Sequence, residues 1–165
     1  MATAAYPTLN SYAPSWADIA TTYTIDGGDL IEMSAFDDIS MSDTVEIGEQ
    51  RGASGGRVMF RTTGSKKSEA KATFFRSGFR QLVRGLVKKA PERGNQKMIS
   101  LVGFDILIQH TPPGESDIYV AKIKGCRLLG RSWTFAEGND ADKVEVTLNP
   151  MEIVDIIDGV EVVLL

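Results

Sequence analysis

The sequence predicts a mainly β domain, either a β-sandwich or a small β-barrel, with one amphipathic α-helix packed against its side. About seven segments have the composition or the alternation of strands, and turns separate them at short spacing. Only one segment, residues 76–89, has the apolar spacing of a helix. The 16 glycines among 165 residues also favour strands joined by many turns.

The first 14 residues are expected to form an N-terminal arm, and residues 15–165 a single domain. Residues 1–14 are small and polar, contain Pro7 and Pro14, and show no apolar periodicity. The remaining chain is long enough to bury one core.

Two extended segments are expected after the arm. Residues 16–25, WADIATTYTI, contain the aromatic, Thr and Ile side chains that favour strands, and the DGGD sequence at 26–29 is typical of a turn. Residues 31–41 alternate apolar and polar side chains with a period of two, which predicts a half-buried strand. Phe36 and Asp37 interrupt this alternation, so a bulge is expected there.

Residues 46–67, EIGEQRGASGGRVMFRTTGSKK, are predicted to form an extended loop with at most a short strand at 58–60. Four glycines fall between residues 48 and 56, which leaves little capacity for packed structure. A loop of this length is uncommon in a compact domain unless it is functional or is ordered by something else. We therefore expect this segment to meet a partner.

Residues 76–89 are predicted to form the one long helix. Two lysines in its last turn and Pro91 just beyond are typical of a helix end. Its apolar stripe, at i, i+3, i+4, i+7 and i+8, consists of Phe79, Leu82, Val83, Leu86 and Val87.

The opposite face of this helix carries a ridge of positive charge. Arg76, Arg80, Arg84 and Lys88 recur at every fourth position with no acidic residue between them. A solvated helix face is usually charged as well, but like charges at this spacing weaken a helix slightly. The pattern therefore favours a contact surface over a face that is only solvated.

The rest of the chain has the pattern of strands. Residues 97–110 are apolar on both faces, as in a central strand covered on both sides, while 117–129 and 143–150 alternate. Residues 152–165 contain an Asp-Gly pair between apolar arms, which predicts a tight hairpin. The last four residues are apolar, so their edge is expected to be paired or covered by another subunit.

Charge is sorted along the chain. Residues 1–50 contain nine acidic residues and no Lys or Arg, residues 51–97 contain thirteen basic and two acidic residues, and residues 98–165 contain eleven acidic and five basic residues. The blocks carry −9, +11 and −6, which sum to the net charge of −4. Sorting on this scale indicates a charged partner unless the fold interleaves the blocks.

No pattern in the sequence supports an enzyme, a metal site or a bound cofactor. The one histidine, His110, has no ligand spacing around it, and the one cysteine, Cys126, is expected to be a small buried side chain. Residues 64–68, GSKKS, lack the leading glycine and the Gly-Lys pair of a phosphate loop. No nucleophile elbow and no calcium-loop spacing is present.

The sequence also predicts no insertion into a membrane. No apolar run approaches the length of a membrane span, and the N-terminus lacks the basic and apolar regions of a secretory signal. We expect assembly in the cytoplasm.

A nucleic-acid-binding β-barrel module is the alternative from a different class. The basic segment 51–97 contains Phe60, Phe74, Phe75 and Phe79, and basic patches with aromatic side chains are typical of such modules. However, Phe79 belongs to the apolar stripe of the helix, and the acidic blocks on either side repel phosphate. Protein contact is therefore the favoured reading.

The order of elements resembles the tail tube proteins of tailed bacteriophages and the tube proteins of related contractile injection systems. The resemblance covers the chain from about Trp16 onward and is based on element order. An extended DLIEMSAFDDISMS and a long Gly-rich basic segment precede a polar strand, SEAKATFF, which runs directly into the helix RSGFRQLVRGLVK. The strands FDILIQH, VAKIKGCRLLG and KVEVTLNP follow.

The resemblance implies a structural subunit of a phage tail tube. Hexameric rings would stack into a hollow conduit through which DNA passes into the host, and the tube protein of a contractile or type VI secretion device is the related alternative. The implied partners are other copies of the chain, a sheath protein if the tail is contractile, and the tape-measure, baseplate and tail-terminator proteins. The implied location is the virion tail, assembled in the host cytoplasm.

The resemblance also implies which residues meet neighbouring subunits. Basic residues of one ring would face acidic residues of the next. The helix ridge would contact a sheath protein or a neighbouring subunit. The inter-ring residues are Arg51, Arg57, Arg61, Lys66 and Lys67 on the basic side and Asp37, Asp38, Asp43 and Glu46 on the acidic side, and the ridge is Arg76, Arg80, Arg84 and Lys88.

Overall fold

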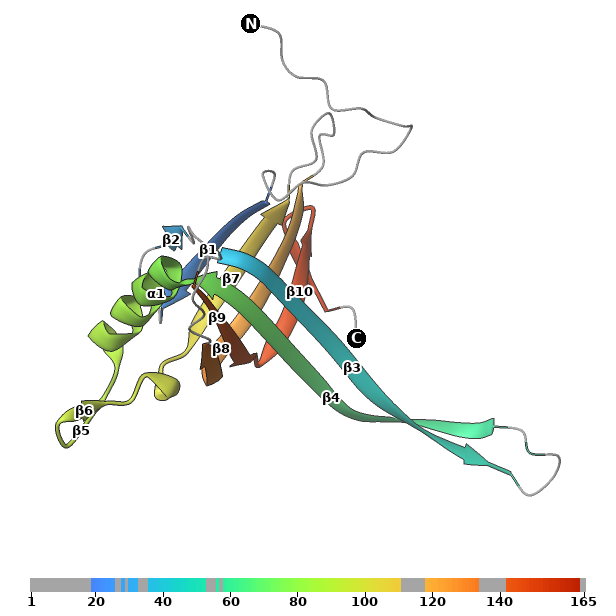
Figure 1. Ribbon diagram of the computed structural model, residues 1–165. Helices are drawn as coiled ribbons and strands as arrows, with labels where there is room; N and C mark the ends of the chain where they lie inside the picture. Colours follow the sequence, from blue (N-terminus) through green and yellow to red (C-terminus); the bar gives the residue numbers. More distant parts are fainter. Residues whose placement is uncertain are drawn as a thin grey trace, which may run out of the picture.

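The computed structural model confirms the predicted fold class, a mainly β fold with one long flanking helix (Figure 1). The structure describes residues 19–25, 28, 30–32, 36–52, 56, 58–110, 118–133 and 142–163. The predicted arm, residues 1–14, lies outside the described residues. The elements are β1 (Ile19–Ile25), β2 (Leu30–Glu32), β3 (Phe36–Arg51), β4 (Val58–Phe75), α1 (Arg76–Lys89), β5 (Glu92–Arg93), β6 (Gln96–Lys97), the 3₁₀ turn η2 (Ile99–Leu101), β7 (Phe104–His110), β8 (Tyr119–Trp133), β9 (Lys143–Asn149), β10 (Glu152–Ile157) and β11 (Val160–Val162).

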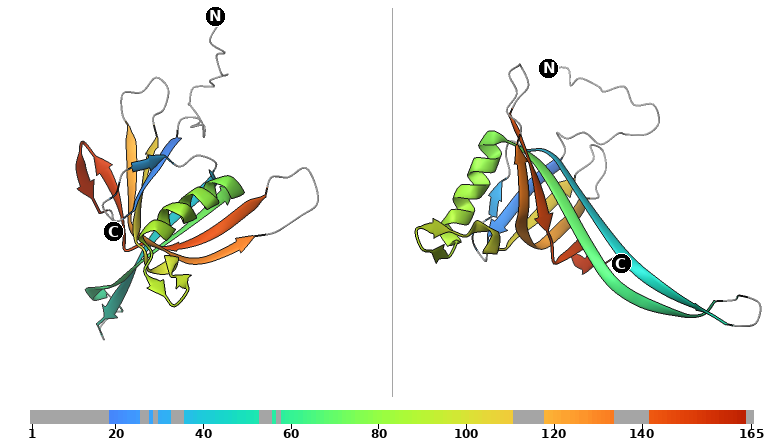
Figure 2. Two further views of the ribbon diagram at one scale, coloured as in Figure 1. Left: turned by 90° about the vertical axis from the view of Figure 1, so that its left-hand side faces the viewer. Right: turned by 60° about the horizontal axis from the view of Figure 1, so that its bottom comes forward.

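Two antiparallel sheets share the long strand β8. The first sheet has the order β2-β1-β7-β8-β10-β11, and it uses the N-terminal half of β8. The second sheet has the order β8-β9-β4-β3, and it uses residues 127–133 of β8. The two sheets therefore diverge where β8 passes from one to the other, as the views in Figure 2 show.

The core lies where the two sheets and α1 meet. α1 buries Phe79, Leu82 and Leu86, three members of the predicted apolar stripe. The strands contribute alternate residues, as expected for one buried face. The remaining large buried side chains include Tyr23, Phe74, Phe104, Ile106, Ile123, Val144 and Val146.

The prediction of an extended loop over residues 46–67 is wrong. Residues 46–51 belong to β3 and residues 58–67 to β4, and the two strands pair antiparallel as a long hairpin (Figure 1). A further glycine of this segment, Gly64, lies opposite an irregularity in the pairing between Val45 and Ile47. A Cβ on Gly64 would lie 2.4 Å from the backbone oxygen of Glu46, so the two backbones approach too closely for any other residue.

Two other strand predictions need correction. The segment 31–41 is not one strand, because Leu30–Glu32 pairs with β1 whereas β3 begins at Phe36 and pairs with β4. The predicted bulge is present, since the register shifts between Phe36 and Asp38. Within 97–110 the strand begins only at Phe104, because Ile99–Leu101 forms the turn η2.

The predicted C-terminal hairpin is confirmed. β10 and β11 pair antiparallel across a turn at Asp158 and Gly159, whose φ angles are 52° and 77°. Positive φ at both central residues is the geometry that an Asp-Gly pair adopts in a two-residue hairpin turn.

Candidate inter-subunit surfaces

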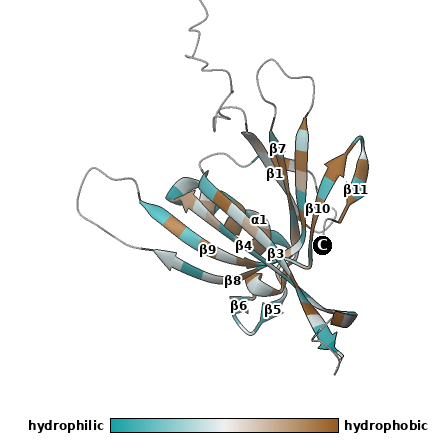
Figure 3. Ribbon diagram, turned by 90° about the vertical axis from the view of Figure 1, so that its right-hand side faces the viewer, coloured by the Kyte–Doolittle hydropathy of each residue, from teal (hydrophilic) through white to brown (hydrophobic). Residues whose placement is uncertain are grey.

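The distal part of the β3–β4 hairpin projects beyond the core. Residues 70–74 of β4 pair with β3 on one side and with β9 on the other, whereas residues 58–69 pair only with β3. Figure 3 shows the hairpin continuing past both sheets with apolar residues along it. Ile47 is 63% exposed and Phe60 is 64% exposed. Large apolar side chains on an isolated two-stranded hairpin are typical of a surface that another chain covers.

Most of the predicted inter-ring charges on this hairpin have partners within the same subunit. Lys66 Nζ lies 3.2 Å from Asp43 Oδ2, and both side chains are largely covered. Glu49 lies between Arg61, at 3.6 Å, and Arg51, at 3.9 Å. Cross-strand pairing brings Arg61 to Glu49, and Arg51 lies two residues beyond Glu49 on the same strand, so these residues are not free charges.

The remaining inter-ring residues are Asp37, Asp38, Glu46, Arg57 and Lys67. Lys67 pairs with Glu69; this hydrogen bond raises the pKa of Lys67 and lowers that of Glu69. Asp37 accepts a hydrogen bond of 2.9 Å from Lys143 of β9. Asp38 and Glu46 are exposed, and Arg57 lies outside the described residues.

Sequence reasoning missed the acidic residues that neutralise this hairpin. Glu49 and Glu69 were counted in the charge blocks but were not assigned to sites. The pairing register of β3 and β4 identifies Glu49, because it places this residue directly opposite Arg61. That register depends on the irregularity at Gly64, which the sequence does not reveal.

The four residues of the helix ridge differ in whether they have an acidic partner within the subunit. Arg76, at the start of α1, donates a hydrogen bond of 3.2 Å to Asp142, and its backbone N–H donates to the Asp142 carbonyl at 3.1 Å. Arg80, Arg84 and Lys88 are exposed, and among the residues that the structure describes none of them has an acidic partner. Three of the four predicted cations therefore remain available for a partner.

These three cations line a groove between α1 and the β1–β2 edge of the first sheet. The groove has a volume of about 400 Å³. Its other lining residues are Tyr23, Ile31, Ser77, Gln81 and Gly85. Gly85 brings the helix close to β1, since a Cβ there would lie 2.7 Å from Ile25 Cδ1. The helix therefore packs closely on β1 at this position.

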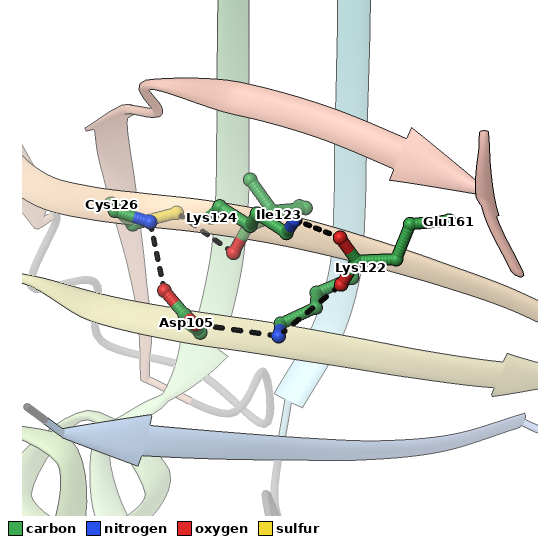
Figure 4. Close-up of polar contacts among 7 residues, drawn as sticks. Asp105, Lys122, Ile123, Lys124, Cys126 and Glu161 are labelled. Carbon is green, nitrogen blue, oxygen red and sulfur yellow. Dashed lines mark hydrogen bonds and ion pairs between the residues drawn. The ribbon is translucent and has the colours of Figure 1, made fainter. Parts of the chain in front are cut away.

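A chain of charges connects β7, β8 and β11 across one face of the first sheet (Figure 4). Lys122 lies 3.7 Å from Asp105 and 3.8 Å from Glu161, and Lys124 also pairs with Glu161. Asp105 Oδ1 accepts a hydrogen bond of 2.8 Å from the N–H of Gly125. These contacts hold the outermost strand, β11, against β8.

Cys126 and His110, the two side chains with catalytic potential, lie at opposite ends of the β7–β8 pairing. Cys126 is fully buried, and burial raises the pKa of its thiol to about 12. His110 stacks on Tyr119, with ring centroids 6.3 Å apart. The described part of the chain contains no cluster of three His, Cys, Asp or Glu side chains arranged for a metal ion, and none of its helices is long and apolar enough to span a membrane.

No protein-family model and no curated protein sequence matches the chain. Several solved structures match its fold. A chain of the extracellular contractile injection system PVC, from the sheath–tube complex in its extended state, matches with a TM-score of 0.58 and 14% identity over 88% of this chain and 93% of that chain. A chain of the anti-feeding prophage cap, the tube-terminating cap, matches with a TM-score of 0.60 and 14% identity over 94% and 98% of the two chains.

The tail tube of SPP1 matches in the same way, with a TM-score of 0.59 and 14% identity over 89% of this chain and 82% of that chain. The chain therefore has a fold of the class found in phage tails and contractile injection assemblies. More specifically, the fold is that of the SPP1 tail tube protein, which confirms the resemblance to tail tube proteins at the level of fold.

Proposed function

We propose that this chain is the structural subunit of a phage tail tube, in which hexameric rings stack into a hollow conduit for DNA. The observation that carries the proposal is the β3–β4 hairpin, which extends from a tail-tube fold and exposes Ile47 and Phe60 where no second layer covers them. A two-stranded hairpin is only marginally stable by itself, and contact with a neighbouring ring would cover it. The proposal assigns the chain no catalytic role.

Stacking through this hairpin has a sufficient driving force. Burying one large apolar side chain contributes about 1.5–3 kcal/mol. In a ring the same contact repeats around the axis, so each subunit adds its own contribution to one stacking event. The anti-feeding prophage baseplate, whose structure was solved with 6-fold symmetry, contains a chain of similar fold with a TM-score of 0.62 and 10% identity over 92% of this chain and 96% of that chain.

The partners follow from the same proposal. Copies of the chain form the rings, and the tape-measure, baseplate and tail-terminator proteins meet the tube at its lumen and ends. A sheath protein is included if the tail contracts, and the match to a chain of the PVC sheath–tube complex favours including it. The assembled subunit would lie in the tail of the virion after assembly in the host cytoplasm.

Asp38 and Glu46, with Arg57, are proposed to contact the adjacent ring. Arg51, Arg61, Lys66, Lys67, Asp37 and Asp43 would contribute there as paired charges, which set the shape and the polarity of the hairpin. Paired charges fix orientation more than they add affinity.

The nucleic-acid-binding alternative is not favoured. Phe74 and Phe79 are buried in the core, and the ring of Phe75 lies 5.7 Å from Lys143 Nζ. Phe60 is the one aromatic side chain of the basic segment, among the described residues, that is largely exposed. A basic segment without a row of stacking side chains has little means to hold single-stranded nucleic acid.

Electron microscopy of the purified protein tests the proposal. Wild-type protein is expected to form rings or tubes, whereas the double variant Ile47→Ser with Phe60→Ser is expected to form no stacked tubes. Unfolding of the isolated double variant should change by less than about 0.5 kcal/mol, because both side chains are exposed in the subunit. A monomer at high concentration whose DNA affinity falls steeply with salt would support the alternative instead.

A matched control separates the hairpin from general surface effects. The double variant Leu101→Ser with Met151→Ser removes two exposed apolar side chains outside the hairpin, and it is expected to stack normally. Loss of tubes in both double variants would contradict a specific role of the hairpin.

A further inference from the structure

Surfaces of opposite charge lie at the two edges of the first sheet. One edge is formed by β2 and β1, with α1 and the groove beside it, and the other by β10 and β11. Figure 1 shows β2 and β10 on opposite sides of the first sheet. In a ring of identical copies related by rotation, one edge of each subunit approaches the opposite edge of the next.

The groove at the first edge is built to receive an anionic group. Arg80, Arg84 and Lys88 line it and have no acidic partner among the described residues. Tyr23 also lines it; this side chain is 2% exposed, and its hydroxyl has no hydrogen-bond partner in the described structure. A buried hydroxyl without a partner is costly, and an incoming carboxylate would accept a hydrogen bond from it.

The β10–β11 hairpin at the second edge is acidic and so complements the basic groove. Residues 152–163 contain four acidic residues and no basic one. Glu161 is held by Lys122 and Lys124, whereas Asp155 and Asp158 have no basic partner among the described residues. The turn places Asp158 between two exposed apolar side chains, Ile157 at 52% and Val160 at 62%.

We propose that the β10–β11 hairpin of one subunit docks in the α1 groove of the next subunit in the ring. Asp158 would meet Arg80, Arg84 and the Tyr23 hydroxyl, and Ile157 or Val160 would pack on the half-buried Ile31. The inference rests on the proposed ring, and it selects a neighbouring copy, not a sheath protein, as the partner of the helix ridge.

A second copy fits this groove better than an unrelated acidic protein for a geometric reason. The acidic hairpin and the basic groove lie on the same sheet at opposite edges, so one head-to-tail contact satisfies both surfaces in every subunit. Such a heterologous contact leaves no free edge when the rotation closes the ring. It would also cover the outer side of β11, which has β10 as its one partner strand in the described structure.

Cross-linking between two different variants tests the direction of the contact. Chains carrying Val160→Cys are mixed with chains carrying Gln81→Cys and treated with a short bis-maleimide. We expect cross-linked pairs in the mixture and none from either variant alone. The native Cys126 is buried and its raised pKa keeps the thiol unreactive, so it remains in place.

A matched control uses the same helix. Lys89 is exposed but does not line the groove, so Lys89→Cys is expected to give few cross-links with Val160→Cys. Cross-links within a single variant, or equal yields at positions 81 and 89, would overturn the inference.

Charge variants test the energetics of the same contact. Asp158→Gly removes the carboxylate at a backbone position with φ of 52°, which glycine adopts freely. This variant and Arg84→Glu are each expected to raise the concentration needed for ring formation by about tenfold or more, since removing one partner of a charge pair leaves the other charge unpaired in the interface. Lys89→Glu should leave that concentration within about threefold, because exposed charges outside an interface contribute little.

The reciprocal variant completes the test. Arg84→Asp together with Asp158→Lys in one chain should recover ring formation in part, because the pair is restored with reversed sign. Rings that form equally well in wild type, Asp158→Gly and Arg84→Glu would overturn the inference and leave the proposed tube function intact. Wild-type protein that forms no rings would instead refute the proposed function and the inference together.

Discussion

The two halves of the β3–β4 hairpin share the same strands but differ in what covers them. In the half nearest the core, Ala70, Ala72 and Phe74 of β4 are each at most 2% exposed, and β9 pairs along the free side of the strand. In the distal half the same strand pairs only with β3, and Phe60 is 64% exposed. The backbones of β3 and β4 pair in both halves, but the described side chains that are buried all lie in the proximal half.

This contrast shows that hydrogen-bonded pairing and apolar burial are separate contributions. Pairing satisfies the backbone of the distal half, whereas a second layer is needed to remove its side chains from water. The proximal half obtains that layer from α1 and the rest of the core within the subunit. For the distal half, we propose that the layer is another subunit.

The largest expected effect comes from breaking the proximal half. Phe74→Ala should destabilise the isolated subunit by about 3–5 kcal/mol, because it removes a buried aromatic side chain and leaves a cavity. Phe60→Ala in the distal half should change the same quantity by less than about 0.5 kcal/mol. Urea unfolding followed by circular dichroism measures both. Equal losses of stability in the two variants would contradict the difference in burial between the two halves.

A smaller effect should follow from disturbing the boundary between the halves. Gly64→Ala places a Cβ against the backbone oxygen of Glu46, so it should destabilise the distal hairpin by about 1–3 kcal/mol while the core remains folded. Hydrogen exchange is expected to accelerate for amides of residues 58–63 and to stay unchanged at Ala70 and Ala72. Faster exchange in both halves would indicate that they unfold as one unit.

The smallest effect should come from the second hairpin, β10–β11, whose outer strand β11 is linked to β8 by ion pairs through Glu161. The hydrogen bond from Lys124 lowers the pKa of Glu161 below its ordinary value of 4.5, and the pair raises the pKa of Lys124 above 10.5. The stabilisation is therefore present between these values. It is lost as the pH falls through the folded pKa of Glu161 or rises through that of Lys124.

The variant Glu161→Gln tests this attachment. It should lower the melting temperature slightly at neutral pH and should flatten the part of the stability profile that lies below pH 4.5. Thermal melting of both proteins from neutral to acidic pH provides the comparison. Parallel profiles for the variant and the wild type would mean that Glu161 does not hold β11.

Local patterns predicted the elements that depend on neighbours in the sequence. The helix Arg76–Lys89 follows from the spacing of its apolar stripe and from Pro91, and the turn at Asp158 and Gly159 follows from the need for positive φ. These features require only residues a few positions apart. They were therefore predictable without knowledge of the fold.

The charge contacts on the hairpin were not predictable in the same way. Arg61 and Glu49 are separated by a turn whose length and register the sequence did not define, and the glycines near it favoured a loop. The sequence predicted that Lys66 faces an acidic residue, but it placed that residue in the adjacent ring. The structure shows Asp43 of the same subunit in that position, 3.2 Å away.

The sequence by itself therefore determined the strand-rich composition, the one helix, the basic ridge and the acidic C-terminal hairpin, because each depends on residue type and short spacing. Only the tertiary structure decided that residues 46–51 and 58–67 belong to paired strands, that Arg76 is bound by Asp142, and that the groove and the acidic hairpin lie at opposite edges of one sheet. These outcomes depend on strands far apart in the chain, whose alignment is set by packing of the whole core and not by any local pattern.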